Sequence, residues 1–248
     1  MPLIVVSKPM LKYSINIILL FTLSTFGLKG QCLVGIFGGM NFSTFYCRSE
    51  TDPHFEINFH SDNTYIIGLN FKERKDRIFN LSLNLDYLIR NVFVDAYYGG
   101  LGYWVYKDIE VNLHSINFQI LPELRLGNRF AVYLNAGPYI GYIVYSQKNG
   151  ESRHGNIDLE YHTEIESGSA KDIFSGFDLG VSATVGLEIP ILKNIKTHPE
   201  FIYNLGLNNI STGSLGNSEG INSKNFFITL GIGYRLNSFN ITDALKKL

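Results

Sequence analysis

Two histidines and a carboxylate form the first group of residues with the types and spacing of a chemical site. His54, Glu56 and His60 fall on one face if residues 53–60 are extended, and imidazole and carboxylate groups are typical zinc ligands. Spacing alone does not close a site, and we interpret these residues as part of a polar loop. The sequence therefore predicts no metal ion and no cofactor.

His114 and Ser115 form the second group, which resembles the base and nucleophile of lipid-cleaving barrels. Neighbouring residues in a strand point to opposite faces, so these two cannot form a nucleophile–base pair directly. No Gly-x-Ser-x-Gly elbow or other catalytic constellation stands out. We therefore expect no catalytic residues and no enzymatic activity.

Cys32 and Cys47 are the only cysteines. If one strand joins them, at about 3.3 Å per residue they lie about 50 Å apart, whereas a disulfide needs Cα atoms within about 7 Å. We expect two free thiols.

The composition favours a membrane protein without spanning helices. Charged residues make up 17% of the 248 residues and aromatic residues make up 14%, whereas soluble domains are roughly 25% charged. The net charge of -1 gives no reason to expect nucleic-acid binding. Beyond the N-terminus no apolar run reaches the roughly 18 residues of a spanning helix. The choice between a soluble β-protein and a membrane barrel therefore depends on periodicity.

From Leu33 onward apolar residues recur with a period of two, which is typical of strands. The clearest run sets one face against the other: Phe79, Leu81, Leu83, Leu85 and Tyr87 against Asn80, Ser82, Asn84 and Asp86. The polar faces carry Gly, Asn, Ser, Thr and single charges, which suit the narrow bore of an eight-stranded barrel. The apolar faces suit a lipid-facing band of roughly 25 Å.

We predict an all-β protein of eight antiparallel strands that close into an up-and-down transmembrane β-barrel. The expected strands are residues 33–45, 64–72, 78–88, 110–126, 129–145, 176–189, 198–210 and 224–237. The connections alternate: residues 46–63, 89–109, 146–175 and 211–223 are long, and residues 73–77, 127–128 and 190–197 are short. Outer-membrane barrels have short periplasmic turns and longer external loops. Both termini are therefore expected in the periplasm.

The N-terminal segment is typical of a secretory signal. Lys8 and Lys12 precede the apolar run 15–28, and a basic stretch before an apolar core of about 7–15 residues is the usual pattern. An uncleaved anchor helix is the alternative. We predict a signal peptide over residues 1–30, cleaved near Gly30, a barrel over residues 31–237 and a short periplasmic tail over residues 238–248.

Several segments resemble the PorT-like family of outer-membrane β-barrel proteins. Residues 35–44 (GIFGGMNFST) are similar to that family's opening strand, and residues 134–142 (LNAGPYIGY) to its GPYxGY strand. Further similar pieces are residues 85–87, 177–180, 186–188 and 203–210. Phe37-Gly38 departs from the family's Lys-Gly. The resemblance covers nearly the whole mature chain and implies a Gram-negative outer-membrane barrel, linked by the family's name to protein secretion.

Seven charged residues are predicted to face the bore: Asp86, Glu123, Arg125, Asp178, Glu188, Glu200 and Arg235. Buried charges must pair or become neutral, and we interpret these residues as a charge network that plugs the barrel. An ion path through a small channel is the alternative.

The second long connection is too apolar for a free loop. Its aromatic residues include Phe93, Tyr97, Tyr98, Tyr103 and Trp104. They fit two interpretations equally: an extension of the flanking strands above the membrane, or a ridge that binds a partner, because exposed apolar patches often mark interaction sites.

We therefore expect a non-enzymatic outer-membrane barrel that contacts outer-membrane lipid and acts through its extracellular loops as a surface or assembly component. A protein partner is expected at these loops, and nucleic acid is not. A membrane-embedded lipid-modifying enzyme and a small channel are the alternatives.

Overall fold

The described part of the chain is almost entirely β-strand. A computed structural model describes residues 31–47, 55–74, 78–100, 102–127, 130–156, 161–174, 176–212 and 220–236. The elements are β1 (Gln31–Cys47), β2 (Phe55–Ser61), β3 (Asn63–Arg74), β4 (Phe79–Gly100), β5 (Tyr103–Leu126), β6 (Ala131–Asn156), β7 (Tyr161–Ser169), the 3-10 helix η1 (Ala170–Asp172), β8 (Phe177–Pro190), β9 (Ile195–Gly206) and β10 (Ile221–Leu236). Within these ranges no helix has the length and apolar character needed to cross a membrane. The predicted signal peptide and periplasmic tail lie outside the described residues.

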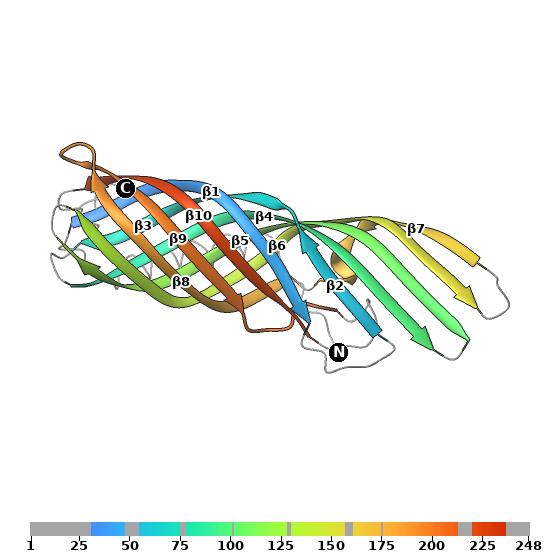
Figure 1. The fold of residues 1–248 in the computed structure, drawn as a ribbon. Helices are drawn as coiled ribbons and strands as arrows, with labels where there is room; N and C mark the ends of the chain where they lie inside the picture. Colours follow the sequence, from blue (N-terminus) through green and yellow to red (C-terminus); the bar gives the residue numbers. More distant parts are fainter. Residues whose placement is uncertain are drawn as a thin grey trace, which may run out of the picture.

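Eight of the described strands close into a barrel (Figure 1). The ring runs β1–β3–β4–β5–β6–β8–β9–β10, and it closes because β1 pairs with β10 as well as with β3. All of these pairings are antiparallel. The prediction of an eight-stranded up-and-down barrel is therefore confirmed.

Alternate residues of the ring strands face the bore and the outside. In β4, Ser82, Asn84 and Asp86 are buried, whereas Leu85 and Tyr87 are exposed. The outside carries exposed apolar residues on the other ring strands, among them Ile67, Ile116, Leu134, Val185 and Leu230. An apolar outside around a polar bore fits a barrel surrounded by lipid.

The two ends of the barrel differ in their connections. One end carries the short connections between β3 and β4, between β5 and β6 and between β8 and β9. In the second of these, Gly127 has a φ of 103°, a left-handed conformation that glycine adopts most easily. β1 starts and β10 finishes at this same end, since Cys32 pairs with Leu236. The longer connections lie at the opposite end, as predicted.

Three strands continue past the ring as a sheet that projects from the long-connection end (Figure 1). In this part β2 pairs with β4, and β7 pairs with β6, so the order is β2–β4–β5–β6–β7. We call β2, β7 and residues 92–100, 103–111 and 147–156 the extension.

The prediction that residues 46–63 and 146–175 are long loops is therefore wrong, because strands occupy most of these segments. Residues 89–109 extend β4 and β5, which was one of the two interpretations of that segment. The alternation is hard to recognise in residues 92–98, since both faces of the sheet are apolar there. Val92, Val94 and Ala96 are buried on one face, while Phe93 and Tyr97 lie on the other.

A β-bulge marks the place where β6 leaves the ring. Ser115 lies opposite Ile143 and His114 lies opposite Tyr145, so Val144 is an extra residue in β6. Before the bulge odd-numbered residues such as Ile143 are buried, and after it Ser146 is buried instead. A bulge bends its strand and increases the local twist, which fits the departure of β6 in Figure 1.

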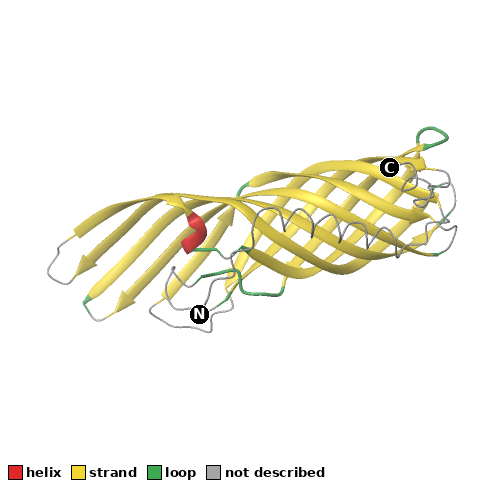
Figure 2. Ribbon diagram, turned by 180° about the vertical axis from the view of Figure 1, so that it is seen from behind, coloured by secondary structure: helices red, strands yellow, loops and turns green. Residues whose placement is uncertain are grey.

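An apolar cluster fills the mouth of the barrel, where the ring meets the extension. This mouth cluster consists of Phe45, Val92, Val94, Ile109, Val111, Leu113, Ile143, Ala170, Ile173, Phe174, Ile210 and Ile221. The short helix η1 carries part of it and lies beside the sheet at the mouth (Figure 2). We call the face of the extension that joins this cluster its inner face and the opposite face its outer face.

Candidate functional site

Near the short connections, the bore holds an ion pair between two residues that are far apart in the sequence. Lys72 Nζ donates to Glu200 Oε1 at 2.7 Å, and both side chains are buried. The Tyr133 hydroxyl donates to the same carboxylate oxygen. Lys72 also lies 4.0 Å from the centre of the Tyr133 ring, within the range of a cation–π contact. Glu200 is therefore held by a charge and a hydroxyl together.

Glu188 forms a second group at this end of the bore. Arg125 Nη2 donates to Glu188 Oε1 at 3.1 Å, and Lys196 Nζ donates to the same oxygen. Glu188 is fully buried, and a buried carboxylate needs such partners because desolvation disfavours an isolated charge.

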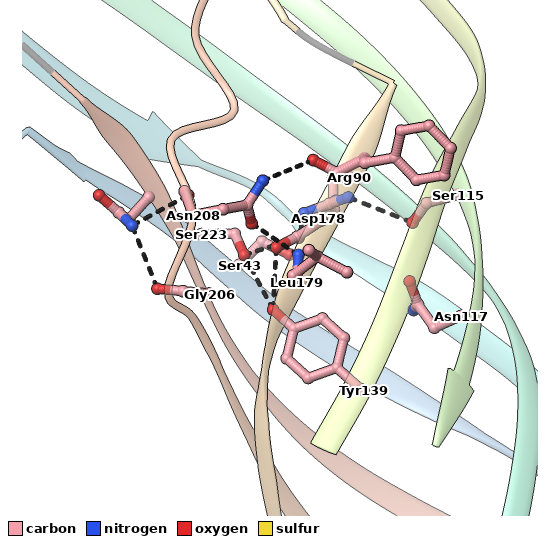
Figure 3. Close-up of polar contacts among 12 residues, drawn as sticks. Ser43, Arg90, Ser115, Asn117, Tyr139, Asp178, Leu179, Gly206, Asn208 and Ser223 are labelled. Atoms are coloured by element: carbon pink, nitrogen blue, oxygen red, sulfur yellow. Dashed lines mark hydrogen bonds and ion pairs between the residues drawn. The ribbon is translucent and has the colours of Figure 1, made fainter. Parts of the chain in front are cut away.

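Asp178 is the centre of a third group nearer the mouth (Figure 3). Arg90 Nη1 donates to Asp178 Oδ2 at 3.2 Å, and Ser223 Oγ donates to the same oxygen at 2.7 Å. The Tyr139 hydroxyl donates to Asp178 Oδ1 at 3.0 Å. Arg90 also donates to Ser115 Oγ at 3.2 Å. These side chains come from β4, β5, β6, β8 and β10, so the group links strands on different sides of the bore.

Asp86 accepts hydrogen bonds from neutral amides. Asn117 Nδ2 donates to Asp86 Oδ1 at 2.6 Å and Gln119 Nε2 donates to Oδ2 at 2.9 Å. Ser182 Oγ reaches from β8 to Gln119 Oε1 at 3.2 Å. Hydrogen bonds and ion pairs between side chains of different strands thus cross the bore at several levels.

The structure places all seven charged residues of the predicted network on the bore side of their strands. Of these, it joins Arg125 to Glu188 directly. Asp178 and Glu200 instead pair with Arg90 and Lys72, and Asp86 bonds amides. Glu123 is buried and Arg235 is half-buried.

The sequence reasoning missed Lys72, Arg90, Lys196 and His198 of the bore. His198 shares the parity of Glu200, which was assigned to the bore, and Lys72 shares the parity of the polar Thr64 and Asn70 of its own strand, so strict alternation could have found both. Arg90 follows Asp86 in the same parity, but the strand was predicted to stop before it.

Outside the bore, a further polar group ties η1 and β7 to β6 beside the mouth cluster. Lys148 Nζ donates to Glu166 Oε2 at 2.8 Å and to Asp172 Oδ2 at 2.7 Å. Burial lowers the pKa of Lys148, but its bonds to Asp172 and Glu166 outweigh burial and raise that pKa. The bond from Lys148 lowers the pKa of the Glu166 carboxyl. We call these three residues the Lys148 latch.

The five aromatic residues of the candidate ridge lie on both faces of the extension. Phe93, Tyr97 and Trp104 are on the outer face, and Tyr98 and Tyr103 are on the inner face, as cross-strand pairs and burial show. Tyr97, Tyr98 and Tyr103 are exposed. Of the two interpretations, the residues do extend the strands, and this extension presents aromatic rings on two surfaces.

The structure does not bring together the other candidate groups, which are the His114–Ser115 pair, the His54, Glu56 and His60 group and the two cysteines. Ser115 is buried in the bore and His114 faces outward, where the Tyr87 hydroxyl contacts His114 Nδ1. His54 lies outside the described residues, and no metal-binding group of three or more His, Cys, Asp or Glu is found in the described ranges. Cys32 and Cys47 occupy opposite ends of β1.

Comparison with known proteins agrees with the barrel. The family described as outer membrane protein beta-barrel domain matches residues 27–212. No curated protein matches the chain.

Three solved structures of outer-membrane proteins are similar in outline. OprG from Pseudomonas aeruginosa is 13% identical, with a TM-score of 0.48 over 84% of this chain and 97% of OprG. Neisserial surface protein A is 11% identical, with a TM-score of 0.41 over 84% of this chain and 98% of its own. Ail from Yersinia pestis is 10% identical, with a TM-score of 0.38 over 84% of this chain and 100% of Ail. Because the family match spans most of the chain, this protein belongs to the outer membrane protein β-barrel domain family and is a bacterial outer-membrane β-barrel.

Proposed function

We propose that this protein is a non-enzymatic component of the cell surface that binds another protein through the extension. The observation that carries the proposal is the extension itself, a hydrogen-bonded sheet beyond the apolar band with exposed Tyr97, Tyr98 and Tyr103. Tyrosine and tryptophan are enriched at protein interfaces because their rings are apolar and their polar atoms can still bond.

The contents of the bore favour binding over conduction. From the mouth towards the short connections, the bore holds first the mouth cluster, then the Asp178 group, and then the Lys72 and Glu188 groups. A water-filled path would have to cross an apolar layer and several cross-strand ion pairs. The separation of His114 from Ser115 likewise favours a role without catalysis.

We propose further that the chain is exported with cleavage near Gly30, and that the extension faces the outside of the cell. Within its family we assign it to the PorT-like members, on the segments 35–44 and 134–142, and to a part in protein secretion. Mass spectrometry of the mature N-terminus tests the cleavage. Protease treatment of intact cells tests the orientation, because we expect cleavage within the extension. Cleavage of the extension only after the outer membrane is permeabilised would refute this orientation.

Two double variants test partner binding and distinguish the faces. Tyr97→Ser with Trp104→Ser alters the outer face, and Tyr98→Ser with Tyr103→Ser makes a similar change on the inner face. Tagged proteins are crosslinked in whole cells and purified from outer membranes. We expect one double variant to lose a crosslinked protein that the other keeps. Unchanged crosslinking in both would refute the proposal, and heat-dependent gel mobility controls for barrel closure.

A further inference from the structure

Two aromatic side chains on the outer face of the extension each lie against a glycine. A Cβ atom added to Gly155 would come within 2.3 Å of the Trp104 ring, and one added to Gly99 within 2.7 Å of the Tyr97 hydroxyl. Trp104 lies directly opposite both Gly99 and Gly155 in the sheet. The faces of aromatic rings attract cations.

A row of carboxylates crosses the same face. Asp95 of β4 lies opposite Asp108 of β5, and Asp108 lies opposite Glu151 of β6. Like charges directly opposite in a sheet destabilise it. The pKa of the Tyr106 hydroxyl in the adjacent row is raised, first by burial and then by the charges of Asp95 and Asp108. The negative charge of this row is therefore felt by its neighbours.

The two faces of the extension differ in charge. Among described residues of the outer face, the acids Glu56, Asp95, Asp108, Glu110 and Glu151 outnumber Arg153, which bonds Glu151 at 3.2 Å. His60 approaches Asp95 at 3.7 Å. On the inner face, by contrast, Lys107 and Lys148 both contact Glu166. The outer face thus has an excess of negative charge that the inner face lacks.

We propose that the outer face of the extension binds an arginine-rich segment of a partner protein. This inference rests on the proposed function and adds the chemistry of the partner. Guanidinium groups are planar, stack on aromatic rings and bond carboxylates through two parallel N–H groups. The rings of Tyr97 and Trp104 supply the stacking surfaces, and Asp95, Asp108 and Glu151 supply the acceptors. A lysine-rich segment would gain the charge attraction without the planar stacking.

The test uses the full barrel in nanodiscs of phosphatidylcholine, which has no net charge. The probe is a fluorescein-labelled peptide of nine arginines, with a peptide of nine lysines as comparison. Trp104 is the only tryptophan, so unlabelled peptide read by tryptophan fluorescence reports binding at the outer face. Asp95→Asn with Asp108→Asn removes two charges from this face. Asp62→Asn with Glu164→Gln removes two exposed charges elsewhere and is the matched control.

We expect the arginine peptide to change the Trp104 fluorescence and to bind more tightly than the lysine peptide. The Asp95/Asp108 variant should raise the dissociation constant at least about fivefold, and the control about twofold or less. Equal effects of both variants, or unchanged Trp104 fluorescence, would overturn the proposal. So would a Trp104 change caused by calcium alone that abolishes peptide binding, because the row would then be a cation site.

The results separate this inference from the proposed function. If crosslinking depends on Tyr97 and Trp104 while all forms bind the arginine peptide equally, the partner surface stands and its arginine-rich occupant is wrong. If the peptide binds at the outer face while neither aromatic variant changes crosslinking, the chemistry of the surface stands and the proposed function fails.

Discussion

Replacing Arg90 with methionine is expected to destabilise the barrel by about 3 kcal/mol, because the change leaves Asp178 as a buried carboxylate without its cation. Arg90 and Asp178 are 1% and 2% exposed. Breaking a buried pair from one side generally costs about 3–5 kcal/mol. The lower end applies here, since Tyr139 and Ser223 still donate to Asp178 after the change.

The double variant Arg90→Met with Asp178→Asn should recover part of this loss. It removes both charges, so no uncompensated ion remains in the bore. We expect its destabilisation to fall short of the sum of the two single variants by about 2 kcal/mol, within the usual range for residues in direct contact.

The assay is urea unfolding in phospholipid vesicles, followed by circular dichroism of the strands. Tryptophan fluorescence is unsuitable, because Trp104 lies in the extension and not in the ring. Heat-dependent gel mobility checks that each variant closes before unfolding. A loss below about 1 kcal/mol for Arg90→Met, or strictly additive single effects, would show that the two charges do not hold the bore together.

Two further predictions concern the extension. Gly155→Ala should displace the Trp104 ring and shift its emission, because the new methyl group would overlap the ring, whereas Gly100→Ala has open space around it and should leave the emission unchanged. The Lys148 latch should stabilise η1 between about pH 5 and pH 10. The lowered pKa of Glu166 gives stability that is present above its ordinary value of 4.5 and is lost as the pH falls through the folded value. The raised pKa of Lys148 gives stability that is present below its ordinary value of 10.5 and is lost as the pH rises through the folded value. Protection factors of the η1 amides, corrected for the intrinsic pH dependence of exchange, that are the same at pH 2 and pH 7 would contradict the prediction for the latch.

The barrel could be predicted from sequence because its two faces meet different surroundings. Lipid outside and a narrow bore inside impose opposite demands on neighbouring residues, as Leu85 and Asp86 show. That contrast produced the alternation, and the glycine turn at Gly127 supported the register. The expected strands match the ring strands closely, except that β9 ends at Gly206 and not at residue 210.

The extension could not be predicted in the same way, because both of its faces carry aromatic or apolar groups. Val94 joins the mouth cluster while Phe93 lies on the outer face, so hydrophobicity alone gives no period there.

The partners of the bore charges could not be predicted from the sequence either. Glu200 pairs with Lys72 across the barrel, and such a contact depends on ring closure and register.

The packing of aromatic side chains against glycines on the outer face has a signal that sequence alone could not interpret. Gly99 and Gly155 are ordinary glycines in the sequence, and only the strand register brings both beside Trp104. The carboxylate row has the same origin, because Asp95, Asp108 and Glu151 are neighbours only across three strands.

The most direct test of the whole account compares spin labels along one outward face of β5. Both native cysteines are replaced by serine, and single cysteines are introduced at Ile116, in the apolar band, and at Glu110, in the extension. In vesicles we expect oxygen dissolved in lipid to reach the label at Ile116 and a water-soluble nickel complex to reach the label at Glu110. A label at Ile116 that the nickel complex reaches, or that neither reagent reaches, would contradict a barrel whose apolar side faces lipid.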